Sequence, residues 1–126
     1  MISRTILHNG GKNMPYINTK VTVKLSDEKK EELKTEFGML ISALNKSEKY
    51  LMVGIEDAQN LWLGGKKLEK GAYVSVSLFG DARKEEYSNL TKKICDLLNH
   101  KLDIPGSAVY ITYHPLHDWG WNGSNF

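Results

Sequence analysis

The sequence has 126 residues, which suits one domain, and 40% of them are hydrophobic, enough to build a buried core. Its 17 Lys and Arg residues nearly balance 15 Asp and Glu residues, and this net charge of +2 argues against a nucleic-acid partner. The single cysteine, Cys95, excludes an intrachain disulfide, and no apolar run approaches the roughly 20 residues of a membrane span, so no membrane partner is expected.

The first residues are predicted to lie outside the folded domain. Residues 9–13, Asn-Gly-Gly-Lys-Asn, have a turn-rich composition, and the segment lacks the apolar core of a signal peptide. We therefore predict a flexible N-terminal extension over residues 1–14 and one domain over residues 15–126. We expect a cytoplasmic location, or export by a route that leaves no signal in the sequence.

The first half of the domain is predicted to alternate strand, helix and strand. Residues 16–23 are β-branched and aromatic, as in a strand. Ser26 and Asp27 provide an N-cap signal for a helix, and the short apolar run 51–55 is typical of a strand buried on both faces, as in a parallel pair. The apolar positions at helical spacing are Leu33, Phe37, Leu40, Ile41 and Leu44.

The same pattern repeats in the second half. Residues 72–79 and 109–113 are strand-like, and an apolar helical stripe lies between them, made of Tyr87, Leu90, Ile94, Leu97 and Leu98. This weak duplication predicts an α/β fold of two tandem βαβ units, with a four-stranded sheet and both helices on one face. The other sheet face would be bare. A bare apolar sheet face normally marks an association surface, so we infer an obligate oligomer.

Several short motifs, in order along residues 15–126, resemble the macrophage migration inhibitory factor branch of the tautomerase superfamily. Met14-Pro15 before a strand resembles the start of that family, where methionine is removed and proline becomes the N-terminus. The other matching motifs are Asn45-Lys46, Tyr50, Leu63-Gly64-Gly65, Phe79-Gly80, Val109-Tyr110-Ile111 and the ending Gly120-Trp121-Asn122-Gly123-Ser124-Asn125-Phe126.

The resemblance implies a homotrimer around a central sheet barrel and a cofactor-independent keto–enol tautomerase of phenylpyruvate-like α-keto acids. Pro15 would be the general base, but only as the N-terminus, since an internal proline nitrogen has no basicity. Lys46 would hold the substrate carboxylate, and Tyr110 would donate to the carbonyl oxygen from the neighbouring subunit. Thr112 stands where the family has a substrate-contacting asparagine. An aromatic wall for the substrate would comprise Tyr50, Phe79, Trp121 and Phe126.

The departures from the family limit what is carried over. Residues 71–74 replace the Cys-x-x-Cys of some members, so no thiol oxidoreductase activity is expected. His114, His117 and Asp118 invite a metal interpretation, but we expect a loop there without a firm scaffold, and no metal. Trp119 and Pro115, like the two histidines, differ from vertebrate members, so no receptor partner is assigned. Two alternatives remain: a cytokine-like binding protein of the same fold, and a ferredoxin-like binding module.

Overall fold

Residues 14–126 are described in the structure, a computed structural model that contains two βαβ units as the sequence predicts. In the first unit, strand β1 (Pro15–Val21) leads into helix α2 (Asp27–Leu40), and strand β2 (Met52–Glu56) returns parallel to β1. Two 3₁₀ turns, η1 (Ile41–Leu44) and η2 (Glu48–Tyr50), connect α2 to β2.

Helix α2 begins as its sequence predicts and ends earlier than expected. The Ser26 side chain accepts a hydrogen bond from the Lys29 N–H, 3.1 Å away, and so caps the first turn. The last two apolar positions of the predicted stripe, Ile41 and Leu44, remain buried but lie in the 3₁₀ turn η1. A tighter last turn is common where a helix ends.

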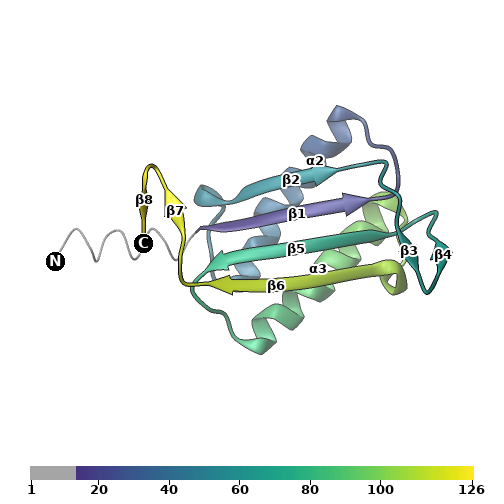
Figure 1. The fold of residues 1–126 in the computed structure, drawn as a ribbon. Helices are drawn as coiled ribbons and strands as arrows, with labels where there is room; N and C mark the ends of the chain where they lie inside the picture. The colour runs from purple at the N-terminus through teal and green to yellow at the C-terminus, as the bar shows by residue number, and fades with distance from the viewer. Residues whose placement is uncertain (1–13) are drawn as a thin grey trace.

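The second unit repeats this path. Strand β5 (Ala72–Phe79) leads into helix α3 (Lys84–Leu102), and after the 3₁₀ turn η3 (Gly106–Ala108) strand β6 (Val109–Leu116) returns parallel to β5. Strands β1 and β5 pair antiparallel at the centre, so the sheet order is β2-β1-β5-β6. Figure 1 shows both helices on the same face of this sheet. The fold class predicted from the sequence is confirmed.

Two small hairpins extend the sheet at opposite ends (Figure 1). Strands β3 (Trp62–Leu63) and β4 (Lys66–Lys67) flank Gly64 and Gly65, whose φ angles of 59° and 81° suit the left-handed turn of a two-residue hairpin. Strands β7 (Gly120–Trp121) and β8 (Ser124–Asn125) form the second hairpin near the C-terminus. The first hairpin lies at the end of the sheet where β1 finishes, and the second lies where β1 starts.

The core fills the space between the sheet and the helices. Alternate residues of β1 and β5 point into it, and Leu33, Phe37, Leu90, Ile94 and Leu98 of the helices are fully buried against them. Neither helix within residues 14–126 has the length and apolar character needed to cross a membrane.

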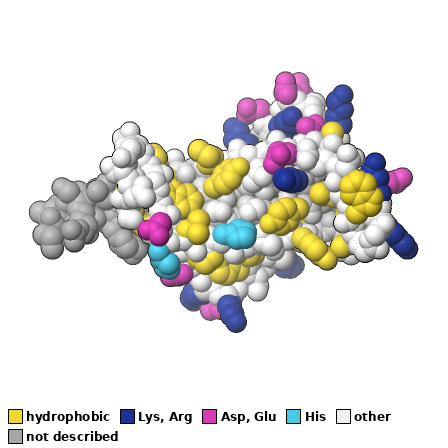
Figure 2. Space-filling model, in the orientation of Figure 1, with side chains coloured by type: hydrophobic (Ala, Val, Ile, Leu, Met, Phe, Trp, Pro, Cys, Tyr) yellow, Lys and Arg dark blue, Asp and Glu magenta, His cyan; other side chains and the backbone are white. Residues whose placement is uncertain are grey.

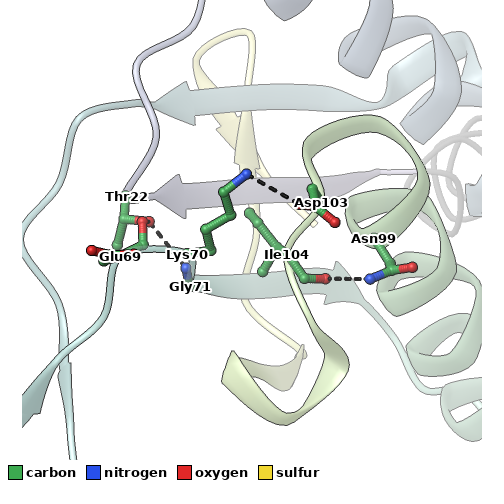
Figure 3. Close-up of polar contacts among 7 residues, drawn as sticks. All are labelled: Thr22, Glu69, Lys70, Gly71, Asn99, Asp103 and Ile104. Carbon is green, nitrogen blue, oxygen red and sulfur yellow. Dashed lines mark hydrogen bonds and ion pairs between the residues drawn. The ribbon is translucent and has the colours of Figure 1, made fainter.

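Polar contacts close the end of the sheet opposite Pro15 (Figure 3). The Thr22 hydroxyl donates to the Glu69 carbonyl, 2.8 Å away, and accepts from the Gly71 N–H at 3.0 Å. Lys70 Nζ lies 3.4 Å from an Asp103 carboxylate oxygen. These contacts join the loop before β5 to the end of β1 and to the end of α3.

Strand β2 differs from the prediction that it is buried on both faces. It is an edge strand, paired only with β1, and its first residue Met52 is 67% exposed. Only Val53 and Ile55 pack against the core. A continuous apolar run cannot by itself tell a central strand from an edge strand, because it does not report how many neighbours the strand has.

The uncovered sheet face is also more polar than we expected. Strand alternation places Asn18, Lys20, Ser75, Ser77, Thr112 and His114 on it. In Figure 2, which looks onto this face, hydrophobic side chains are interspersed with polar and charged ones. The face is therefore mixed in character and not uniformly apolar as expected, and it is bare within the described chain.

Asp57 after β2 ties the loop to the start of α2, and its removal should weaken the fold in a pH-dependent way. One carboxylate oxygen accepts from the Leu25 N–H at 2.8 Å and the other lies 3.3 Å from Lys30 Nζ. The hydrogen bond from the Leu25 N–H lowers the pKa of Asp57 below its ordinary 3.8, and Lys30 makes a smaller contribution in the same direction. Because the folded-state pKa is depressed, this stabilisation is present above 3.8 and is lost as the pH falls through the folded-state value.

We expect Asp57→Asn to lower the melting temperature at pH 7. In strong acid the melting temperatures of the variant and the parent should become similar. Thermal unfolding followed by circular dichroism at both pH values measures this. Glu69→Gln, at an exposed carboxylate, should leave the melting temperature at pH 7 nearly unchanged. If Asp57→Asn lowered the melting temperature by the same amount in strong acid, the stabilisation would not come from the ionised Asp57 carboxylate.

Candidate functional site

A cavity of about 450 Å³ opens at the end of the sheet where β1 starts. Its lining combines cationic, acidic and apolar side chains from three segments, which are the end of η1 and the residues after it, the end of β5 through the first turn of α3, and the residue after β6. The lining residues are Leu44, Asn45, Lys46, Phe79, Gly80, Asp81, Glu86 and His117.

Lys46 is placed in this cavity by the turn that precedes it. Asn45 ends η1 in the left-handed conformation, with a φ of 58°, and its N–H donates to the Ser42 carbonyl at 2.9 Å. Asparagine adopts this conformation more easily than most residues. The turn directs the chain back toward the sheet, and Lys46 is only 8% exposed. A cationic side chain is therefore held in the cavity wall.

The end of β5 supplies the opposite side of the cavity. Gly80 has a φ of 91°, which favours glycine, and its N–H donates to the Leu116 carbonyl at 2.8 Å. This bond holds the loop after β5 against the end of β6. Phe79, one residue earlier, is nearly buried.

The four aromatic residues predicted to form a wall are brought together. Tyr50 meets Trp121 edge-on with ring centroids 6.1 Å apart, and Trp121 stacks with Phe126 at 6.4 Å. Phe126 in turn contacts Phe79 at 5.6 Å. These rings come from η2, β5 and the C-terminal segment, and they form one continuous group, called here the aromatic group. Since Trp121 is 48% exposed, the group has an accessible apolar surface beside the cavity.

Pro15 lies next to this site. It pairs with Leu78, and the carbonyl of the preceding Met14 accepts a hydrogen bond from the Phe79 N–H at 3.2 Å. Met14, which we placed in the N-terminal extension, is only 4% exposed. The remainder of that predicted extension, residues 1–13, lies outside the described residues.

Tyr110 and Thr112 are not part of this cavity in the single chain. Pro15 is level with Pro115 through Leu78, whereas Tyr110 pairs with Tyr73 near the other end of the sheet. Pro115 lies five residue steps after Tyr110 on β6, roughly 16 Å along the strand. Tyr110 is 63% exposed. One chain therefore brings together Lys46, Pro15 and the aromatic group, but not these two side chains.

Two acidic residues of the cavity were missed by sequence reasoning. Asp81 follows the glycine after β5, and Glu86 lies in the first turn of α3, where it also accepts from the Arg83 N–H at 2.8 Å. The pKa of Glu86 is lowered mainly by this hydrogen bond from the Arg83 N–H. The positive charges of Arg83 and Lys46 lower it further. A loop between a strand and a helix often carries functional residues, and this was the signal available in the sequence.

The segment with the two histidines is only partly the loop that we expected, since His117 and Asp118 lie outside the strand but His114 does not. Strand β6 continues through His114 and Pro115 to Leu116. Proline is tolerated there because β6 is an edge strand. His117 lines the cavity, whereas His114 bonds to Thr112 on the sheet face. Within residues 14–126, no three His, Cys, Asp or Glu side chains gather where they could hold a metal ion.

Cys95 lies on α3 and is half-buried. Burial, with a smaller contribution from Asp96, raises the pKa of its thiol. A thiol with a raised pKa is a poor nucleophile near neutral pH.

Comparison with known proteins identifies relatives over the whole described region. A family model described as macrophage migration inhibitory factor (MIF) matches residues 14–126. The macrophage migration inhibitory factor homolog of Trichinella spiralis is 31% identical over 117 residues, which cover 90% of this chain and 100% of that protein. Macrophage migration inhibitory factor of Xenopus laevis is 33% identical, over 69% of this chain and 76% of that protein.

Solved structures agree with these matches. The crystal structure of Leishmania major MIF2 superimposes with a TM-score of 0.84 at 30% identity, and covers 92% of this chain and 100% of that one. The macrophage migration inhibitory factor homologue from Prochlorococcus marinus has a TM-score of 0.78 at 27% identity, over 88% and 98% of the two chains.

Proposed function

The chain belongs to the macrophage migration inhibitory factor family of the tautomerase superfamily, and we propose that it catalyses keto–enol tautomerisation of phenylpyruvate-like α-keto acids. The observation that carries the proposal is the position of Lys46. This nearly buried cation lies in a cavity that shares Phe79 with the aromatic group. Pro15 pairs with Leu78, the residue before Phe79. A carboxylate site next to an aromatic surface and a candidate base suits an aryl α-keto acid.

The reaction moves a proton between carbon and oxygen, so it needs a base and a site for the developing oxyanion. An N-terminal proline carries a secondary amine that can accept the proton. An ordinary α-amine has a pKa of about 7.7–8.0. Apolar surroundings and a nearby lysine cation both favour the neutral form of such an amine. A base that is neutral near the operating pH is effective in general-base catalysis.

The substrate would be oriented by two contacts with this chain. Lys46 binds the carboxylate as a point charge, and the aromatic group packs against the phenyl ring. Both contacts leave the carbon that carries the mobile proton near Pro15. The protein groups supply all the acid–base chemistry in this proposal, so no cofactor is required.

The remaining contacts come from a neighbouring subunit in the proposed assembly. Tyr110 would donate a hydrogen bond to the carbonyl oxygen, where charge develops, and Thr112 would lie beside it. Tyr110 and Trp62, 63% and 60% exposed, line one shallow hollow of about 100 Å³ with mostly apolar neighbours. Exposed aromatic side chains around an apolar hollow favour a contact with a second copy of the chain.

We therefore predict a homotrimer whose site is shared between subunits. Sedimentation equilibrium at micromolar concentration should give three times the mass of the chain. Tyr110→Phe should keep this mass and lower kcat by about 10- to 1000-fold, because a donor to the developing oxyanion is lost. Stable monomers would contradict the shared site, and an unchanged kcat would remove Tyr110 from it.

A second candidate is a cytokine-like binding protein of the same fold with little or no turnover. It is favoured by one observation: in the full chain Pro15 is joined to a buried Met14, and its nitrogen is an amide. The enol-to-keto conversion of phenylpyruvate, assayed on a chain that begins at Pro15, separates the two candidates. Turnover supports the tautomerase, and its absence in a folded trimer supports the binding protein.

A further inference from the structure

A chain of three polar side chains runs over the uncovered face of the sheet, apart from the cavity. The hydroxyl oxygens of Tyr73 on β5 and Thr112 on β6 lie 2.7 Å apart. Thr112 Oγ1 also lies 2.8 Å from Nε2 of His114, two residues further along β6. Both hydrogen bonds therefore meet at one oxygen atom. We call Tyr73, Thr112 and His114 the hydroxyl–histidine chain.

The number of protons in the hydroxyl–histidine chain decides what else Thr112 can bind. A threonine hydroxyl has one proton and can accept two hydrogen bonds, and a tyrosine hydroxyl also has one proton. If Nε2 of a neutral His114 carries no proton, Thr112 donates to His114 and Tyr73 donates to Thr112. Two bonds then use both hydroxyl protons, and Thr112 has none to offer a ligand.

Protonation of His114 changes this count. Three protons are then available for the same two bonds, because Nε2–H becomes a donor. Tyr73 and His114 both donate to the Thr112 oxygen, which fills its two acceptor positions. The Thr112 proton is released and can point away from the chain toward another acceptor.

We propose that His114 is a positioning residue that controls whether Thr112 can donate a hydrogen bond to the oxygen of an α-keto acid. The inference rests on the proposed function, in which Thr112 faces the pocket of a neighbouring subunit. Ligand binding through Thr112 should therefore strengthen when His114 takes up a proton.

The groups that share this face with His114 do not replace it in this role. Its register partner on β5 is Ser77, which does not titrate, and β6 is an edge strand, so no further strand lies on its other side. The titratable side chains placed on the face by strand alternation are Tyr16 and Lys20 from β1, Glu56 from β2, Tyr73 from β5 and Tyr110 from β6. Of these side chains, Tyr73 is the one bonded to Thr112, and its proton is already included in the count.

Phenylglyoxylate tests the proposal independently of turnover, because this aryl α-keto acid has no enolisable hydrogen. Its Kd is measured by calorimetry at pH 8 and pH 6 on a chain that begins at Pro15. Removing the imidazole frees the Thr112 proton at every pH, so His114→Phe should bind about 2- to 12-fold more tightly than the parent at pH 8 and equally at pH 6. A merely structural role for His114 would instead weaken binding at both pH values.

Two further variants test the proton count within the hydroxyl–histidine chain. Thr112→Val has no hydroxyl proton, so adding His114→Phe to it should leave the Kd unchanged at both pH values. Tyr73→Phe removes only the Tyr73 hydroxyl, so Thr112 and His114 can still reverse their donor and acceptor roles. This variant should keep the pH dependence of the parent. His100→Gln, at an exposed histidine on α3, controls for the loss of a histidine and should match the parent.

Nitrogen-15 NMR of the His114 ring gives a second measurement. Nε2 should carry no proton in the neutral ring and should gain one when the ring is protonated. Protonated Nε2 in the neutral ring, equal Kd values for parent and His114→Phe, or no binding of phenylglyoxylate at either pH would each overturn the proposal. Binding with the expected pattern but without turnover of phenylpyruvate would instead count against the proposed function alone.

Discussion

The full chain is expected to convert phenylpyruvate about 10²- to 10⁴-fold more slowly than a chain that begins at Pro15, because that is the contribution of a well-placed general base. In the full chain the Pro15 nitrogen belongs to the peptide bond with Met14. Its lone pair is delocalised into the carbonyl group, so the nitrogen cannot accept a proton near neutral pH. A chain that begins at Pro15 exposes a secondary amine at the same position in β1.

The position of Met14 adds a steric reason. Its side chain is nearly buried, and its carbonyl is bonded to the Phe79 N–H beside the cavity. Met14 therefore lies next to the proposed substrate site. A chain that begins at Asn13 separates steric hindrance from loss of the base. It keeps the amide at the Pro15 nitrogen but lacks residues 1–12.

The measurement is the enol-to-keto rate of phenylpyruvate for three proteins of verified intact mass. We expect the full chain and the chain that begins at Asn13 to be equally slow. If the Asn13 form recovered most of the activity, hindrance by the earlier residues would be the main effect. A full chain as fast as the Pro15 form would show that another group is the base.

Lys46→Ala is expected to lower kcat/KM for phenylpyruvate by about 10- to 150-fold, because a charge-assisted hydrogen bond to a carboxylate is worth about 1.5–3 kcal/mol. The side chain is 8% exposed in the cavity wall, so little else can take its place there. The cost to the fold should be much smaller. A cation near a helix C-terminus typically contributes about 0.3–1 kcal/mol.

Matched variants separate charge at the site from charge on the protein as a whole. Lys92→Ala removes the same charge from an exposed position on α3 and should leave kcat/KM nearly unchanged. Lys46→Arg keeps a cation in the cavity and should recover part of the loss. Equal kcat/KM values for Lys46→Ala and the parent, in a fold of unchanged melting temperature, would remove Lys46 from the substrate site.

The elements of the fold could be predicted because their signals are local. The apolar stripe of α3, with Leu90, Ile94 and Leu98, recurs at helical spacing in the sequence and is buried in the structure. Strand β5 was predicted with its observed bounds, residues 72–79. Two such strand–helix–strand patterns leave few topologies, since crossovers between parallel strands are nearly always right-handed.

Features that depend on neighbours in space were predicted less well. The apolar run of β2 suggested a central strand, but the pairing of β1 with β5 leaves β2 at the edge. Pro115 suggested a loop, yet an edge strand tolerates proline. The polarity of the bare sheet face was also misjudged, because it is decided by which residues of four strands share one side.

The candidate site shows the same division. Lys46, Pro15 and the aromatic residues were selected because short motifs, in order along the chain, resemble those of the family. Their meeting at one end of the sheet, the presence of Asp81 and Glu86 in the same cavity, and the distance of Tyr110 from it were decided only by the tertiary structure. The physical reason is that side-chain periodicity determines which face of an element is buried, whereas the contents of a cavity depend on how separate elements pack together.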